Sequence, residues 1–235
     1  MGEILSDNSR YSLIFVKFNG LNKASISQRT DYGKRSLLFA YEQLMNRIAS
    51  ENICISDTTV RPRKDTYLYD YDSVNEAVIN AIVHNDWTIS APQISFFSDR
   101  LEILSHGGLP HGLTEEEFYK GISKPRNMKL MKIFSDLDIV EHTGHGIPTI
   151  IAKYGKKAFT LSDNFIIATI PFNKAVTDTF ISYKQPHFPG MIDNTIVSDL
   201  NRTEEKIISV IISDPGITIP GISEKTLIAK RTVER

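Results

Sequence analysis

The sequence predicts an α+β fold, because amphipathic helices and strand hairpins both recur along its 235 residues. Apolar residues repeat at helical spacing over 36–48, and a second clear helix is expected over 73–84. Two short apolar runs, 93–97 and 100–104, are separated by a Ser-Asp pair, which indicates a β-hairpin. Hydrophobic residues make up 41% of the chain and charged residues 23%, which excludes a mostly disordered protein.

The composition excludes several classes of protein. The formal net charge of −1 gives no overall affinity for nucleic acid or membrane, so any such binding must come from a local patch. Cys54 is the single cysteine, which excludes an internal disulfide framework and a cysteine-based zinc site. We expect a cytoplasmic protein, because the sequence has neither a signal peptide nor an apolar run of about 18 residues.

The chain divides into four parts in this interpretation. Residues 1–30, with a strand at 12–18, are expected to be the tail of a preceding domain or a linker. Residues 31–172 are expected to form the main domain, and residues 173–200, with little periodicity, a linker. Residues 201–235 are expected to form a partial, winged type of helix-turn-helix.

The remaining elements of the main domain follow from caps and turns. Ser73 is expected to cap the 73–84 helix, with Glu76 completing a capping box. Thr114 is expected to cap a short helix that ends at residue 119. Two further helices and a closing pair of strands are expected over 127–137, 147–154, 158–161 and 165–171.

Glu76 and Asn80 are the first candidates for chemistry. Their i,i+4 spacing puts a carboxylate and an amide on one face of the 73–84 helix. A carboxylate can orient and activate a water, and an amide oxygen can coordinate a hard cation such as Mg²⁺. A solvated helix face is the simpler explanation of such a pair when it is taken alone.

Two glycine-containing loops are the next candidates. One is Ser105-His106-Gly107-Gly108 at the exit of a strand, where glycines allow close approach of a ligand to the backbone. The other is 144–146, Gly-His-Gly, directly before a helix, where free amide groups can bind phosphate. Each loop taken alone is better explained as an ordinary turn.

The order of these pieces resembles the GHKL (Bergerat) ATP-binding fold. In particular, the segments 75–87, 99–110, 124–127 and 141–147 resemble the C-terminal ATPase-like domain of RecG-related transcriptional regulators. The similarity spans roughly residues 2–172. Those proteins commonly carry an AlbA/Schlafen-type domain before this one, which we expect to be absent here, and a helix-turn-helix after it.

The resemblance implies a two-layer α/β sandwich of the GHKL type, with ATP bound between the helical layer and a loop lid. It implies that Glu76 is the water-activating base and that Asn80 holds Mg²⁺. The implied nucleotide contacts are Asn80, the first glycine box, residues on or near the lid, and the phosphate loop: Ser105, His106, Gly107, Gly108, Arg126, Asn127, Gly144, His145 and Gly146.

Some features depart from that pattern. Ser105 stands where the wider superfamily has an aspartate that recognises the adenine amino group, and a serine accepts that hydrogen bond without charge assistance. The chain contains no G-xxxx-G-K-[ST] sequence, so we expect no motor helicase and at most a slow ATPase. His84 and Asp86 could be metal ligands or an acid–base pair, but a helix cap and a bond to a loop amide explain them better.

The C-terminal segment resembles the middle of a helix-turn-helix. Helices are expected over 203–213 and 220–226, then a turn and the start of a recognition helix at Ala229. Four basic residues against Glu234 give a charge of +3 over the last eleven residues. The residues expected to contact duplex DNA are Lys225, Lys230, Arg231, Thr232 and Arg235. A helical packing hairpin with solvated lysines is the alternative.

Two functional hypotheses follow. The first is an adenine-nucleotide-binding module of a DNA-binding transcriptional regulator, in which ATP changes the order of the lid and thereby the helix-turn-helix. The second is a vestigial ATPase fold that acts as a dimerisation or interaction scaffold, with a homodimer as its partner and no nucleotide. Ser105 favours the second hypothesis, and the Glu76–Asn80 pair favours the first.

Overall fold

The structure is a computed structural model that describes residues 6–139, 146–184 and 217–229, together with Thr203, Lys206, Ile207 and Val210. The chain forms two compact units, Met1–Ser182 and Tyr183–Arg235. Each unit is described by itself.

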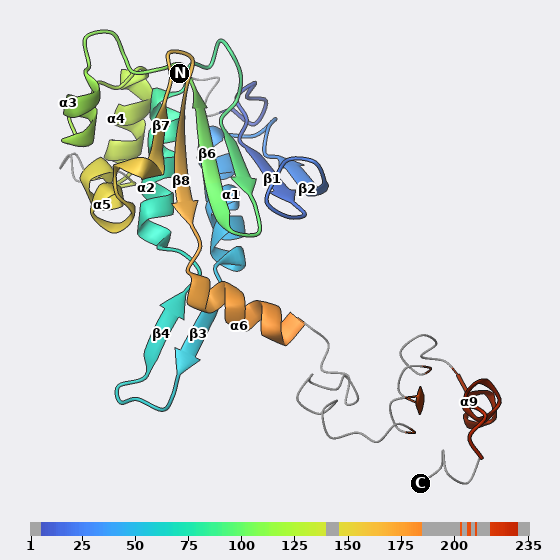
Figure 1. Cartoon of the computed structure of the whole chain (residues 1–235). Helices are drawn as coiled ribbons and strands as arrows, with labels where there is room; N and C mark the ends of the chain where they lie inside the picture. The colour runs from blue at the N-terminus through green and yellow to red at the C-terminus, as the bar shows by residue number, and fades with distance from the viewer. Residues whose placement is uncertain are drawn as a thin grey trace. The chain divides into compact units, whose positions relative to one another are not determined.

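One mixed sheet of six strands is the framework of the first unit (Figure 1). Its strand order is β2-β1-β5-β6-β8-β7. The pairing of β1 with β5 is parallel, and the other four pairings are antiparallel. The strands are β1 (Ile14–Phe18), β2 (Ile26–Asp31), β5 (Gln93–Phe96), β6 (Arg100–His106), β7 (Phe159–Leu161) and β8 (Phe165–Pro171).

The position of β1 corrects the expectation that residues 1–30 are a tail or a linker. β1 lies between β2 and β5, so this segment is part of the main sheet. Phe15 is fully buried in the core beneath the helices, whereas Val16 and Phe18 pack with Phe97 in a second apolar cluster. Because successive side chains of a strand point to opposite faces, one short apolar run contributes to both clusters.

A layer of helices covers one face of the sheet, which gives the expected α+β fold (Figure 1). α2 is central to this layer, because it contacts β6, β8, α4 and α5. Eight of its residues are buried, seven of them apolar. The helices of this unit that cover the core are α1 (Leu37–Glu51), α2 (Tyr71–His84), α3 (Glu115–Tyr119), α4 (Met128–Asp136) and α5 (Gly146–Tyr154).

The start of α2 differs from the expected capping box. Asp70 is the N-cap, and its side chain accepts hydrogen bonds from the Ser73 N–H at 2.9 Å and the Ser73 hydroxyl at 2.6 Å. Ser73 is therefore inside the first turn and fully buried. Asp70 also pairs with Lys153 of α5, which ties the two helices together. Glu76 has no capping role and is free for another one.

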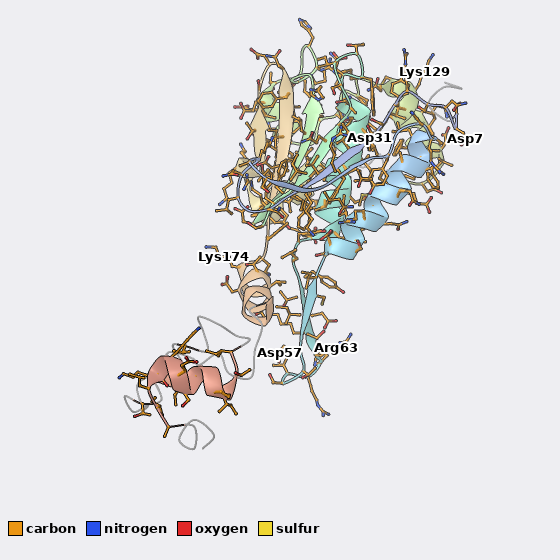
Figure 2. The ribbon with its side chains drawn as sticks, turned by 90° about the vertical axis from the view of Figure 1, so that its right-hand side faces the viewer. Asp7, Asp31, Asp57, Arg63, Lys129 and Lys174 are labelled. Carbon is orange, nitrogen blue, oxygen red and sulfur yellow. The ribbon has the colours of Figure 1, made fainter. Side chains whose placement is uncertain are left out.

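A second, two-stranded sheet was missed by the sequence interpretation. β3 (Cys54–Asp57) and β4 (Lys64–Tyr67) form an antiparallel hairpin that projects beyond the main sheet (Figure 1). Asp57 and Arg63, near its tip, lie at the opposite end of this unit from Lys129 (Figure 2). Most of its residues are exposed on both faces, so the alternating apolar pattern that predicts a strand is absent.

Most other expected elements are present. Thr114 caps α3 in a capping box with Glu117, as predicted. The expected linker 173–200 is wrong at its start, because α6 (Lys174–Lys184) is helical. The Asn173 side chain accepts a hydrogen bond from the Ala175 N–H at 3.0 Å, and Val176 is fully buried, which together anchor this short helix.

In the second unit, α9 (Ile219–Thr226) matches the helix expected over 220–226. Thr218 caps it, and Leu227 ends it in a left-handed conformation with φ of 58°. Thr203, Lys206, Ile207 and Val210 are helical, and Ala229 is not. The expected recognition helix after Ala229 lies outside the described residues, so the helix-turn-helix stays a prediction. Within the described parts, no helix combines the length and apolarity needed to span a membrane.

Candidate functional site

A cavity of about 440 Å³ lies between α2, the strands β6 and β8, and the segment that links β6 to α4. This volume lies in the range of small-molecule binding sites. The walls are mainly apolar, and the polar side chains that line the cavity are Glu76, Asn80, His84, Ser105 and Ser123.

Glu76 and Asn80 both line this cavity and contact each other. The Asn80 Nδ2 donates to Glu76 Oε1 at 2.7 Å and to the Glu76 carbonyl at 2.9 Å. Because the amide nitrogen is used in this way, the Asn80 side chain offers its Oδ1 as a ligand for a cation, beside the carboxylate oxygens of Glu76. The i,i+4 spacing therefore brings the two groups together at the cavity wall, as the sequence indicated.

The Glu76 carboxylate lies directly against the first residue of α5. A Cβ added to Gly146 would meet Glu76 Oε1 at 1.7 Å, so only a glycine leaves room for the carboxylate. Burial raises the pKa of Glu76, and the hydrogen bond from Asn80 acts in the opposite direction. A carboxylate with a raised pKa is a better proton acceptor at neutral pH than an exposed one.

Ser105 also lines the cavity, from the C-terminal half of β6. Its side chain is buried, with 5% of the residue exposed, and it lies opposite Ile166 of β8. The adjacent His106 does not line the cavity. The His106 N–H donates to the Asn85 Oδ1 at 2.8 Å, and the His106 carbonyl accepts from the Asp86 N–H at 2.8 Å.

The two glycines of the first glycine box have partners within the protein. Gly107, with φ of 84°, donates its N–H to the Asn164 carbonyl at 2.7 Å, and Gly108 donates to the Asp163 carbonyl at 3.0 Å. A Cβ on Gly108 would lie 2.4 Å from the Ser162 carbonyl oxygen. Neither glycine lines the cavity. Close packing against the turn between β7 and β8 explains the glycine at position 108.

Arg126 and Asn127, which were expected to bind nucleotide, instead bind the C-terminal end of α2. The Arg126 Nε donates to the His84 carbonyl at 3.1 Å, and Arg126 Nη2 donates to the Gly108 carbonyl at 3.0 Å. The Asn127 Nδ2 donates to the carbonyls of Val83 and Asn85. The last carbonyls of a helix have no partner within the helix, which is the physical reason for these contacts.

Several expected site residues are outside the described parts of the chain. Gly144 and His145 of the expected phosphate loop precede the first described residue of α5. Lys225 is exposed on α9. Lys230, Arg231, Thr232 and Arg235 are likewise outside the described residues.

His84 also lines the cavity. Burial, with a smaller contribution from the Arg126 charge, lowers the pKa of His84 to about 4. Asp86 accepts hydrogen bonds from the Thr88 N–H at 3.1 Å and from the Thr88 hydroxyl at 2.6 Å, which is the loop-amide role that we favoured. The described residues contain no group of three or more His, Cys, Asp and Glu side chains that could hold a metal ion.

The apolar side of the cavity was not predicted from the sequence. It comes from residues between the first glycine box and α4, including Leu109, Leu113, Phe118, Ile122 and Met128. Ile122 and Met128 are 50% and 66% exposed. The available signal was a series of large apolar residues in a segment rich in glycine and proline, where polar residues are usual.

Residues 90–166 match the family model described as "Putative ATP-dependent DNA helicase recG C-terminal". This match supports the resemblance of this part of the chain to a RecG-related, ATPase-like domain. The match includes Ser105 and Gly146, but it begins after the helix that carries Glu76 and Asn80.

A crystal structure of the DIP2311 protein from Corynebacterium diphtheriae has a similar fold, with a TM-score of 0.61 at 17% sequence identity. The alignment covers 99% of this chain and 48% of that one, so this chain spans about half the length of the DIP2311 protein. None of the curated proteins matches the sequence significantly.

The pKa of His84 leads to a prediction on pH dependence. An unfolded histidine has a pKa near 6.5, so between about pH 6.5 and pH 4 the unfolded chain binds a proton that the folded chain does not. The free energy of unfolding should therefore fall by about 3 kcal/mol as the pH is lowered from 7 to 4 because of this residue alone. Urea unfolding of the wild type and His84→Gln at both pH values measures it. An equal fall in the free energy of unfolding in the two proteins would contradict the lowered pKa of His84.

The contact between Gly146 and Glu76 predicts that substitutions at the two positions have strongly non-additive effects on the free energy of unfolding. Gly146→Ala should destabilise the wild type by about 1–3 kcal/mol, because the new methyl group displaces the carboxylate. In a Glu76→Ala background the same change should cost almost nothing, since the space is empty. Urea unfolding of the four proteins in this double-mutant cycle gives the coupling energy. Additive effects would show that the two residues do not compete for this space.

Proposed function

We propose that the first unit is an adenine-nucleotide-binding domain that takes ATP, with Mg²⁺, in the cavity beside α2. The observation that carries the proposal is the convergence of Glu76, Asn80, Ser105 and Gly146 on this one cavity. The match of residues 90–166 to an ATPase-like family model supports it independently.

The cavity suits the chemistry of a nucleotide. Its apolar walls can bury the faces of a purine ring, while the Ser105 hydroxyl can accept a hydrogen bond from an amino group on the ring edge. Gly146, at the N-terminal end of α5, is the residue of the expected phosphate loop that lies within the described part of the chain. Amide groups at the start of a helix favour anions.

The donor set also fits Mg²⁺ that arrives with the nucleotide. Mg²⁺ prefers oxygen ligands and is usually held by one or two protein groups, with waters and phosphate oxygens completing its shell. The Asn80 Oδ1 is the proposed protein ligand. When bound, Mg²⁺ would neutralise phosphate charge. Glu76, with its raised pKa, is the proposed acceptor of a proton from water, so a slow ATPase activity is the most that this site would support.

A scaffold that binds no nucleotide is the second candidate function. The observation that favours it is the commitment of the Gly107 and Gly108 amide groups to the turn between β7 and β8. The side chains of Arg126 and Asn127 are likewise bound to backbone carbonyls rather than directed at the cavity. The backbone amide groups of Gly107 and Gly108 cannot bind a phosphate without giving up those bonds.

We further propose that the chain is a DNA-binding regulator, with the basic C-terminal segment as the DNA contact. The support is the charge of +3 over the last eleven residues of a chain whose formal net charge is −1. Helix α9, with its cap at Thr218, is consistent with the helix that precedes the turn of such a motif.

Nucleotide binding is tested by calorimetric titration of the wild type with ATP and Mg²⁺. Asn80→Ala should weaken Mg²⁺-dependent binding, because it removes the proposed ligand atom. Glu76→Ala should retain binding while any hydrolysis falls by about 10²–10⁴-fold. Asn75→Ala is the matched control, since Asn75 lies on the same helix, accepts a hydrogen bond from Tyr41 and does not line the cavity.

The alternatives give different results in that titration. If the wild type unfolds cooperatively but gives no heat of binding at millimolar ATP, the result would favour the scaffold. Equal weakening by the substitutions at Asn75 and Asn80 would show that loss of helix stability, rather than loss of a ligand atom, is responsible.

DNA binding is tested by fluorescence anisotropy with duplex DNA at several salt concentrations. Lys230→Ala with Arg231→Ala should lower the affinity and reduce the slope of log K against log[salt] by about 2, because two phosphate contacts are lost. Lys129→Ala with Lys132→Ala, on α4, removes the same charge elsewhere and should leave the slope unchanged. An unchanged slope in the C-terminal variant would remove these residues from the interface.

A further inference from the structure

The segment 109–126 covers the apolar side of the cavity and is called the lid here. Of its residues, Leu109, Leu113, Phe118, Ile122 and Pro125 line the cavity. It contains α3, and it is followed directly by Asn127 and α4. Its first residue follows Gly108, and its last residue is Arg126.

Arg126 joins the two ends of the lid to the end of α2. Its Nη2 donates to the carbonyl of Gly108, just before the lid begins, at 3.0 Å. Its Nε donates to the carbonyl of His84, in the last turn of α2, at 3.1 Å. A third, longer contact of 3.9 Å links its Nη1 to the Asp86 carboxylate. A single guanidinium therefore holds the two ends of the lid together at the end of α2. This junction is called the neck of the lid here.

Asn127 completes the same neck from the next position. Its side-chain amide donates to the Val83 carbonyl at 2.8 Å and to the Asn85 carbonyl at 2.9 Å. Its own N–H also donates to the Val83 carbonyl, at 3.2 Å. These bonds fix the point at which the lid ends and α4 begins.

The absence of a side chain at Gly107 leaves room for Arg126 at the neck. A Cβ at Gly107 would lie 2.7 Å from Arg126 Nη2 and 3.3 Å from the Asp86 Cβ. Its φ of 84° is also a conformation that other residues rarely adopt. The glycine is thus explained by the approach of the guanidinium and not by the approach of a phosphate.

The outer part of the lid contacts the rest of the first unit through aromatic rings. Phe118 packs edge-to-face on Phe159 of β7, with 5.2 Å between ring centroids. The Lys156 ammonium lies 4.8 Å from the centre of the Tyr119 ring. Such contacts contribute less than charge-assisted hydrogen bonds, so opening of the lid would begin here while the neck stays closed.

We propose that Arg126 and Asn127 are positioning residues that clasp the neck of the lid and thereby set how often the cavity opens. Neither residue lines the cavity beside α2, so both act through the lid. The effect on ligand exchange rests on the proposed nucleotide-binding function, whereas the effect on the lid does not. Loss of the clasp should open the lid more often and speed both entry and release of a ligand.

Hydrogen–deuterium exchange of the whole chain, measured by mass spectrometry, tests the clasp without any ligand. In Arg126→Ala, lid amides and those of Gly107 and Gly108 should exchange about 10- to 100-fold faster, because two charge-assisted bonds are lost. Arg126→Lys should give a smaller increase, since an ammonium cannot reach both carbonyls as a planar fork does. Amides of α1 should be unchanged.

Arg100→Ala is the matched control. Arg100 makes comparable bonds to Glu102, Asp99 and the Leu21 carbonyl, but at the other end of β6. It should leave lid exchange unchanged. Faster exchange across the whole first unit in Arg126→Ala, or wild-type exchange in the lid, would overturn the clasp. If Arg126→Ala does not fold, Asn127→Ala and Arg126→Lys are measured against the same two criteria.

A stopped-flow measurement with Mg²⁺ and a fluorescent mant-ATP then separates the two proposals. Faster lid exchange together with faster mant-ATP release in Arg126→Ala supports both. Faster lid exchange in a protein whose wild type binds no mant-ATP upholds the clasp and contradicts the nucleotide site. Wild-type release rates in a variant whose lid exchanges faster would show that the lid does not control access.

Discussion

The C-terminal carbonyls of α2 are the constraint on which the arrangement of the site depends. The helix ends inside the protein, and the carbonyls of its last turn need hydrogen-bond donors. The indole of Trp87 donates to the Ile82 carbonyl at 3.2 Å, and Asn127 and Arg126 donate to the next carbonyls along the chain. Trp87 lies in the segment directly after α2, whereas Arg126 and Asn127 lie where the lid ends and α4 begins. The hydrogen bonds to the C-terminal carbonyls of α2 therefore also position the loops around the cavity.

The middle and the N-terminal end of α2 make different contacts. Its middle presents Glu76 and Asn80 to the cavity, where the carboxylate packs against Gly146 at the start of α5. Its N-terminal end is joined to α5 through Asp70 and Lys153. α5 is thus located at both ends by contacts with α2.

The elements that the sequence predicted correctly are those with local signals. The i,i+4 spacing of Glu76 and Asn80 was sufficient to place them on one face, and Thr114 with Glu117 was sufficient to begin α3. Ser73 and Glu76 imitate a capping box one turn inside the true start at Asp70, because that pattern does not depend on burial. The roles of Arg126 and Gly107 depend on contacts across about forty and about twenty residues of chain, which spacing alone does not reveal.

A crystal structure of the chain with Mg²⁺ and a non-hydrolysable ATP analogue tests the central claim most directly, namely that this cavity is a nucleotide site. We expect the purine ring between α2 and the inner face of β6 and β8, beside Ser105, with Mg²⁺ on the Asn80 Oδ1 and the lid closed over the ring. An analogue bound elsewhere on the chain, or a cavity that stays empty at saturating analogue, would contradict the account.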